Sequence, residues 1–202
     1  MVPFPLPFGG NNNDNDNDDG GLFDAYDQFV SNHVPEPGPF LRDHRVLTDD
    51  EHVAFHTRTR DLFEQRKVYD MTFNYNLARL NLDTRHLDAG YRYAEEADDS
   101  SVLRAEFSPT TPFCPQSHTL TIGSFRAWNG LSEKHDYDLV RVRTAPMHHQ
   151  SDSINEQLEE LEKEYLETGS VEHEPEGDVG SNPMERTMQN ERPSRGSPDA
   201  PF

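Results

Sequence analysis

The chain is poor in cysteine, in lysine and in long apolar runs, and each shortage excludes a class of protein. One cysteine, Cys114, in 202 residues rules out an internal disulfide framework and a zinc site built from four cysteines. Three lysines against 38 acidic residues leave a net charge of −20, which opposes binding to nucleic acid and to anionic membranes. The same imbalance favours adaptation to high salt over an ordinary acidic cytosolic protein. No apolar run approaches the roughly 20 residues that span a bilayer, so we expect no membrane or nucleic-acid partner.

The low apolar content limits how much of the chain can be packed into a core. Hydrophobic residues make up 32% of the sequence, so we expect a core over only part of its length. Residues 9–21 are Gly, Asn and Asp alone, and residues 169–202 lack apolar periodicity, so both stretches are predicted to be disordered. The first ten residues lack the basic start and apolar stretch of a signal peptide, which favours a soluble protein of the cytoplasm.

We divide the chain into an acidic extension (1–45), a folded domain (46–168) and an acidic tail (169–202). In the extension, apolar residues at helical spacing over 22–30 predict a short amphipathic helix. The three prolines and one glycine of residues 34–39 predict a linker. The short helix could dock on another protein or fold back onto the domain.

The folded domain carries a regular succession of helix and strand patterns. Thr48 and Glu51 have capping-box spacing at the start of an expected helix. The expected order is a helix over 48–66, half-buried strands over 87–93 and 103–107 that form a hairpin, a helix over 115–129, a strand over 137–144 and a helix over 151–168. This order predicts an α+β two-layer domain, with a small mixed sheet of three or four strands and helices on one face.

Cys114 lies just before the predicted helix over 115–129. A helix N-terminus favours the thiolate, which is the reactive and metal-binding form of cysteine. The alternative is a buried cysteine that packs as a small hydrophobic residue. His118 would share a helix face with Cys114 and could help to hold a soft ion, although a solvated histidine is the simpler interpretation. Two ligands from one chain imply that any metal is shared or transient.

Three segments of the chain resemble motifs of the small metal–sulfur cluster assembly factors. This family includes the eukaryotic cytosolic iron–sulfur targeting factor and the D-type subunit associated with bacterial phenylacetyl-CoA oxygenase. Its Phe-Thr-Pro-Thr-Ile-Pro-His-Cys, Thr-Pro-Gly-Thr-His-Ala-Ser and Val-Asn-Lys-Gln-Leu motifs are similar to residues 107–114, 144–151 and 154–158. Upstream, the family's Asp-Pro-Glu becomes Asp70-Met-Thr, and the glycine of its Leu-Gly pair becomes Asn81. The resemblance covers about residues 68–168 and is closer after residue 107.

The resemblance implies a role in maturing iron–sulfur proteins through protein contacts, without a turnover reaction of its own. It implies that Cys114 is the functional atom and that His148 occupies the family's histidine position. We expect His148 to shape the metal- or cluster-related site, because imidazole readily titrates and ligates metals. The site-shaping residues that it implies are Asp70, Thr110, Thr111, Pro112, Thr144 and Asn155. An iron–sulfur cluster or iron would be bound transiently, the partners would be client proteins or assembly components, and a homodimer is possible. The alternatives are an accessory subunit of a multicomponent oxygenase and an interaction module that kept the fold without the thiol role.

Overall fold

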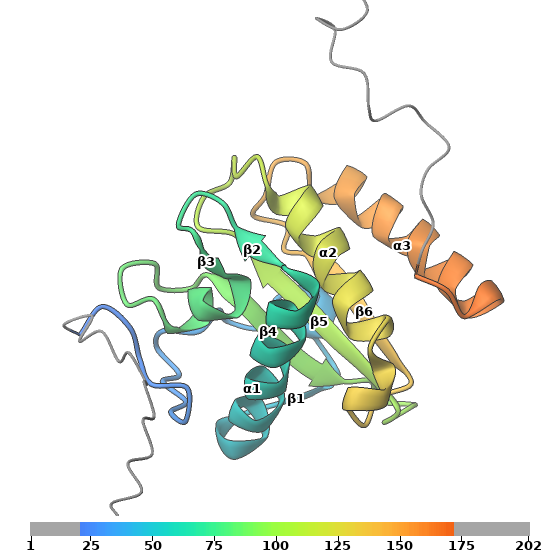
Figure 1. Cartoon of the computed structure of the whole chain (residues 1–202), viewed down its shortest axis with the longest axis horizontal. Coiled ribbons are helices and arrows are strands. Elements are labelled where there is room, and N and C mark those ends of the chain that lie inside the picture. The colour runs from blue at the N-terminus through green and yellow to red at the C-terminus, as the bar shows by residue number, and fades with distance from the viewer. Residues whose placement is uncertain (1–20, 172–202) are drawn as a thin grey trace, which may run out of the picture. The chain divides into compact units, whose positions relative to one another are not determined.

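A four-stranded mixed sheet forms the core of the computed structural model, which describes residues 21–171 (Figure 1). The strand order is β1-β4-β5-β6. The strands are β1 (Arg45–Val46), β4 (Gly90–Glu95), β5 (Val102–Ser108) and β6 (Leu139–Thr144). β4 pairs antiparallel with β1 and β5, whereas β5 pairs parallel with β6. The predicted hairpin and the predicted α+β class are confirmed, while residues 9–20 and 172–202 lie outside the described residues.

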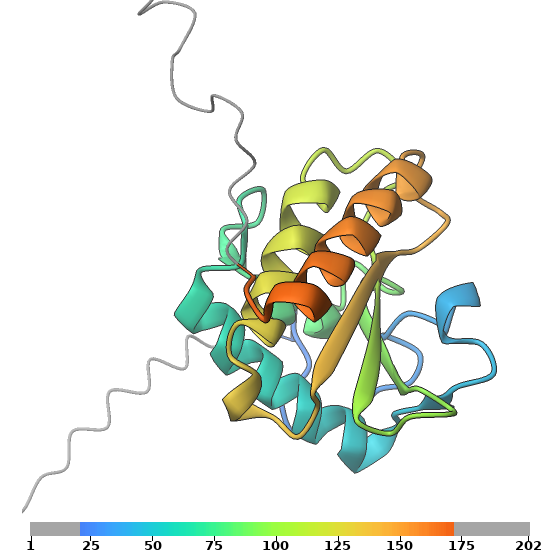
Figure 2. The same cartoon turned by 90° about the vertical axis from the view of Figure 1, so that its right-hand side faces the viewer.

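Helices and a small ribbon complete the part of the chain that the structure describes. The α-helices are α1 (Asp49–Arg66), α2 (Ser117–Asn129) and α3 (Ser151–Thr168). The 3-10 helices are η1 (Pro39–Leu41), η2 (Leu77–Leu82) and η3 (Ser132–Lys134), and the ribbon consists of β2 (Tyr69–Asp70) and β3 (Tyr75–Asn76). The three predicted domain helices are present, with ends within two residues of those expected. α1 and α2 lie on one face of the sheet, and α3 packs beside α2 and along β6 (Figures 1 and 2).

α1 begins after Thr48, but the predicted capping box is not formed. Thr48 makes no side-chain hydrogen bond to the helix. Glu51 instead accepts hydrogen bonds from Arg45 of β1 on both carboxylate oxygens, at 2.9 and 2.7 Å. The acidic first turn still stabilises this end of the helix, because negative charge complements the helix dipole.

Aromatic side chains fill the space between the sheet and the helices. Tyr91 and Tyr93 of β4 both face this layer and are fully buried. The Trp128 ring of α2 lies 5.0 Å from Tyr91, and Phe55 of α1 lies 4.8 Å from Tyr93, both edge to face. Burial of each ring contributes about 2–3 kcal/mol, and edge-to-face pairs add about 0.5–1.5 kcal/mol. This layer fixes the helices to the strands whose ends carry the loops described below.

The segment before β1 differs from the prediction, because it packs across the opposite face of the sheet. Residues 22–30 form no helix, and the expected linker over 34–39 runs into η1. The Phe29 ring lies 5.3 Å from the Arg92 guanidinium, and the Phe40 ring lies 4.7 Å from that of Arg104. β4 is therefore buried on both faces, and its expected half-burial was wrong. Of the two alternatives for the extension, the structure shows folding back.

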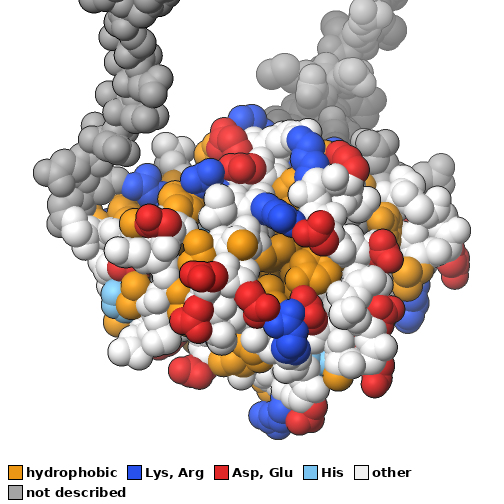
Figure 3. All heavy atoms as spheres, turned by 90° about the horizontal axis from the view of Figure 1, so that it is seen from below, with side chains coloured by type: hydrophobic (Ala, Val, Ile, Leu, Met, Phe, Trp, Pro, Cys, Tyr) orange, Lys and Arg blue, Asp and Glu red, His pale blue; other side chains and the backbone are white. Residues whose placement is uncertain are grey.

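The surface combines both signs of charge despite the acidic composition. On the face seen in Figure 3, Lys and Arg side chains lie among Asp and Glu side chains around an apolar area. Arg45 bridges Glu51 and Glu95, and Arg58 pairs with Asp136. Such exposed pairs each contribute at most about 1 kcal/mol. Among residues 21–171, no helix has the length and apolar character needed to cross a membrane.

Candidate functional site

Three loops meet at the N-terminal end of α2. The first loop, residues 109–116, carries Cys114 and follows β5. The second loop, residues 145–150, follows β6 and carries His148. The third loop joins β2 to β3 and carries the turn that begins at Asp70. Hydrogen bonds join the second and third loops to the first.

Cys114 is half-exposed and lies three residues before the start of α2. Its amide donates to the Thr111 carbonyl at 3.3 Å, and its own carbonyl accepts from the Ser117 amide at 3.3 Å. These bonds fold the loop into two successive turns ahead of the helix. The predicted helix start at residue 115 was two residues early, because α2 begins at Ser117. The residue is nevertheless not sealed in a core, because it is only partly buried.

His148 is buried and fastens its loop to the backbone of Cys114. The Nε2 atom lies 3.1 Å from the Cys114 carbonyl oxygen. The Nδ1 atom accepts a hydrogen bond from the Gln150 amide at 3.2 Å. Since Nδ1 is the acceptor, the geometry assigns the proton to Nε2, which donates to the carbonyl. In this neutral form both nitrogens are occupied, so His148 positions the cysteine loop through its carbonyl.

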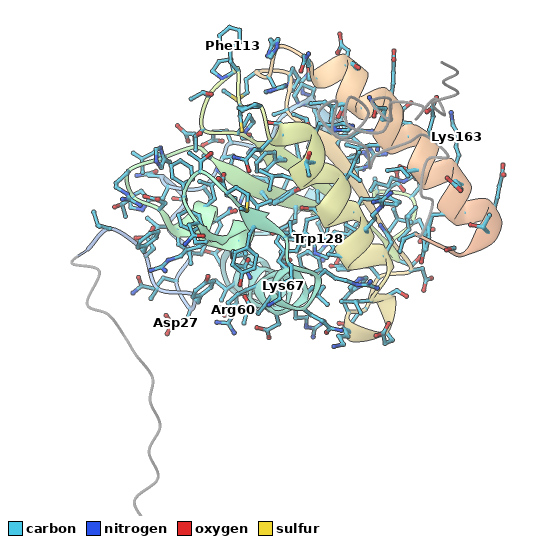
Figure 4. All side chains as sticks on the ribbon, turned by 45° about the horizontal axis from the view of Figure 1, so that its top comes forward. Asp27, Arg60, Lys67, Phe113, Trp128 and Lys163 are labelled. Atoms are coloured by element: carbon cyan, nitrogen blue, oxygen red, sulfur yellow. The ribbon has the colours of Figure 1, made fainter. Side chains whose placement is uncertain are left out.

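His149 and Phe113 form a second connection that sequence reasoning did not identify. The His149 amide and its Nδ1 atom both donate to the Pro112 carbonyl, at 3.0 and 2.8 Å. The Phe113 ring lies 4.9 Å from the His149 ring and is 71% exposed. In Figure 4, Phe113 lies at the edge of the molecule and points outward. The sequence shows only that Phe113 lies between two prolines and that His149 is the second of two adjacent histidines. Neither feature predicts that these two side chains are in contact.

Gln116 joins the Asp70 turn to the cysteine loop. Its Oε1 atom accepts from the Met71 amide at 3.0 Å, and its Nε2 atom donates to the Thr72 hydroxyl at 2.6 Å. The buried Asp70 carboxylate accepts from the amides of Thr72 and Phe73, at 2.7 and 3.2 Å, which shapes this turn. The structure therefore brings the predicted Asp70 to the site. Gln116 was missed because one amide in a proline-rich loop carries no pattern.

Asn155 fixes the end of β6 to the first turn of α3. Its Oδ1 atom accepts from the Thr144 amide at 2.7 Å, and its Nδ2 atom donates to the Thr144 carbonyl at 3.0 Å. Thr144 itself is fully buried. These two predicted residues thus contact each other and set where the loop carrying His148 begins. Thr110 is half-exposed and Thr111 exposed, and the latter contributes its carbonyl to the turn at Cys114.

His118 lies on the first turn of α2 and binds α3. Its Nε2 atom donates to the Gln157 side-chain oxygen at 2.6 Å. Across residues 21–171, no three His, Cys, Asp or Glu side chains are grouped so as to hold a metal ion. The candidate site therefore offers one accessible thiol on a braced loop, with imidazoles that are already hydrogen-bonded.

Comparison with known proteins places the chain in a family. A family model described as a domain of unknown function, DUF7998, matches residues 21–172. The chain belongs to the DUF7998 family. The matched range includes the segment that covers the second face of the sheet, and it ends just beyond α3. No curated protein and no solved structure matches the chain. The family description carries no function.

Proposed function

We propose that this DUF7998 member is an iron–sulfur cluster assembly or targeting factor of the cytoplasm. It matures client proteins through direct contact and has no turnover reaction of its own. The observation that carries the proposal is the single thiol, Cys114, half-exposed on a loop that is hydrogen-bonded to two neighbouring loops. The resemblance of residues 107–158 to metal–sulfur cluster assembly factors supports the same class.

The chemistry of a cluster as cargo suits this arrangement. A thiolate is the ligand that iron–sulfur clusters use, and Cys114 supplies one. The remaining ligands come from the client, from an assembly component or from a second copy of the chain, so the cluster passes through the site and is not retained. The bonds from His148 and Gln116 hold the loop in place before a partner arrives, which lowers the ordering cost of the contact.

The test measures incorporation of ⁵⁵Fe into protein-bound clusters in cells that lack the chain. We expect reduced incorporation, restored by the parent sequence and not by Cys114→Ser. The control combines Cys114→Ser with Ser153→Cys, which keeps one thiol but moves it to an exposed position on α3. This double variant is expected to fail as well. Unchanged ⁵⁵Fe incorporation in cells without the chain would overturn the proposal.

The same experiment separates the two alternatives. A loss confined to the reductase of one oxygenase, together with a stable complex between that enzyme and this chain, would assign an accessory subunit. Full restoration by Cys114→Ser would assign an interaction module that does not use its thiol. If two defective variants restore ⁵⁵Fe incorporation only when they are expressed together, the chain acts as a homodimer.

A further inference from the structure

Among the histidines at the candidate site, His149 is the exposed one, and one of its ring nitrogens is unbonded. His148 is buried and uses both of its nitrogens on backbone groups, one of them the Cys114 carbonyl. His118 is half-buried and uses Nε2 to bind α3. His149 uses Nδ1 alone, and its Nε2 atom makes no hydrogen bond within residues 21–171. The site therefore has one exposed imidazole with a nitrogen to offer.

The tautomer of His149 follows from its hydrogen-bond partner. A carbonyl oxygen only accepts hydrogen bonds, so the 2.8 Å contact between Nδ1 and the Pro112 carbonyl places the proton on Nδ1. In the neutral ring the lone pair is then on Nε2. Histidines that bind metals are usually held in this way, because one nitrogen donates to a carbonyl or carboxylate while the other binds the ion. His149 thus has the orientation of a metal ligand.

Three contacts fasten His149 to the loop that carries Cys114. Besides the bond from Nδ1, its amide donates to the Pro112 carbonyl at 3.0 Å, and its ring lies 4.9 Å from the Phe113 ring. Pro112 and Phe113 are the central residues of the turn that the Cys114 amide closes on the Thr111 carbonyl. The Cα atoms of Pro112 and Cys114 are at most about 7 Å apart. An ion bound to sulfur at about 2.3 Å and to nitrogen at about 2.1 Å joins donors about 4 Å apart, so rotation of the two side chains suffices to bring them to one ion.

The donors on these loops select the kind of ion. Residues 109–116 and 145–150 contain no Asp, Glu, Lys or Arg, in a chain of which 28% is charged. The carboxylate of the third loop, Asp70, is buried and accepts from the amides of its own turn. Ca²⁺ and Mg²⁺ are bound mainly through carboxylate oxygens, which these loops do not offer. Sulfur together with imidazole suits a softer divalent ion such as Fe²⁺, Co²⁺ or Zn²⁺.

We propose that His149 is the second ligand beside Cys114 and that this pair binds a soft divalent ion such as Fe²⁺. The inference deepens the proposed function and rests on it for the identity of the cargo. Binding releases the thiol proton to solvent, because the thiolate is the form that ligates. Two ligands leave positions on a tetrahedral ion for a partner protein, so this chain alone binds the ion weakly and passes it on. His148 then positions the cysteine loop and does not ligate.

The test is titration of the purified full chain with Co²⁺ without oxygen, in which thiolate-to-cobalt charge-transfer absorption reports the bond to Cys114. We expect the parent to develop this absorption and Cys114→Ser to lack it. His149→Asn keeps an N–H in the place of Nδ1, where it donates to Pro112, but removes the second nitrogen. It should weaken Co²⁺ binding at least about tenfold, a loss that even indirect partners of a metal ligand cause. His118→Asn makes the same change on α2 and should leave the Co²⁺ affinity unaltered.

Imidazole ¹⁵N NMR provides the independent measurement. In the metal-free chain the ring proton of His149 should be on Nδ1, and Zn²⁺ should shift the Nε2 signal. Equal Co²⁺ affinities of the parent and His149→Asn, or no thiolate-to-cobalt absorption in the parent, would overturn the proposal, because the variant keeps the bond to Pro112 that a purely structural role requires. A loss of affinity in His118→Asn alone would also contradict it. Both measurements use purified protein without clusters, so unchanged ⁵⁵Fe incorporation overturns the proposed function only, and equal Co²⁺ affinities overturn this inference only.

Discussion

The side chains at the candidate site act mainly on backbone groups, and Asn155 is the clearest case. Its carboxamide satisfies both the amide and the carbonyl of Thr144. Asn155→Asp keeps an acceptor for the amide but turns an anion toward the carbonyl, where a donor is needed. We expect it to lower the free energy of unfolding by about 1–3 kcal/mol in urea titrations. Gln157→Glu makes the same chemical change two residues further along α3 at an exposed position. It keeps the side-chain oxygen that accepts from His118, so it should be near neutral. Equal losses in both variants would refute the assigned role.

The sequence predicted which of these residues belong to the site, but not the contacts that they make there. Asp70, Cys114, Thr144 and Asn155 were expected at one site, and the structure brings their loops together. Their roles depend on backbone atoms, which a residue pattern does not display. His148 was expected to shape the site by titration or ligation, yet both of its nitrogens are occupied by backbone partners. The bracing residue Gln116 and the exposed ring of Phe113 become visible only when distant loops meet.

Among the elements, the sheet and the helices followed from periodicity, whereas the segment before β1 did not. Apolar residues over 22–30 have helical spacing, but the three aromatic ones contact separate partners on the folded domain: Phe23 lies against Arg79, Tyr26 against Arg60 and Phe29 against His52. The strand alternation of β4 places Arg92 on a face that seemed open to water. In the structure this face carries a layer of arginines beneath Phe29 and Phe40. Local patterns do not reveal such a cover, because it depends on contacts between residues far apart in sequence.

Replacing two arginines of that layer by methionine is expected to change the unfolding free energy in opposite directions. Arg92 is 6% exposed, and its Nε and Nη1 atoms have no hydrogen-bond partner among residues 21–171. Burial lowers the pKa of Arg92, and the carboxylate that acts to raise it, Glu36, is exposed. Arg92→Met keeps the contact with Phe29 and removes an uncompensated charge, so we expect a gain of about 1 kcal/mol in unfolding free energy.

Arg104→Met is the matched control for the change at Arg92. Arg104 lies in the same layer beneath the Phe40 ring, but it pairs with Glu96 and donates to the Phe40 carbonyl at 3.2 Å. Removal of the Arg104 guanidinium leaves the half-buried Glu96 carboxylate with weaker pairing. We expect the unfolding free energy to fall by about 1–2 kcal/mol. Urea unfolding followed by far-ultraviolet circular dichroism measures both variants. Destabilisation by Arg92→Met would show that the guanidinium is satisfied in solution.

For the whole molecule, two buried histidines make the free energy of unfolding fall as the pH is lowered. The acidic composition alone would not suggest this direction. Burial is the main cause that lowers the pKa of His52 to about 2, with the neighbouring His56 and Arg92 acting in the same sense. Burial likewise lowers the pKa of His56 to about 4, although its bond to the Ala78 carbonyl opposes the shift. Both groups take up protons more readily in the unfolded chain, where their pKa is about 6.5. The stabilisation that comes from keeping these two histidines neutral is therefore fully present above pH 6.5. As the pH drops toward 4, the free energy of unfolding falls by up to about 1.4 kcal/mol per pH unit for each group.

His52→Phe tests this dependence, because the two histidines differ in their bonding. The Nδ1 atom of His52 has no hydrogen-bond partner within the described residues, and its ring lies among aromatic neighbours. His52→Phe should raise stability relative to the parent by an amount that grows by up to about 2 kcal/mol between pH 7 and pH 5. His56 accepts from the Tyr93 hydroxyl at 2.9 Å and donates to the Ala78 carbonyl at 2.8 Å, so His56→Phe removes a hydrogen-bond partner from two buried groups and should destabilise by about 2 kcal/mol at pH 7. Urea unfolding at constant ionic strength, followed by fluorescence of the buried Trp128, measures all three proteins. A parent and a His52→Phe variant whose stabilities stay parallel from pH 7 to pH 5 would show that His52 is not the buried neutral group assigned here.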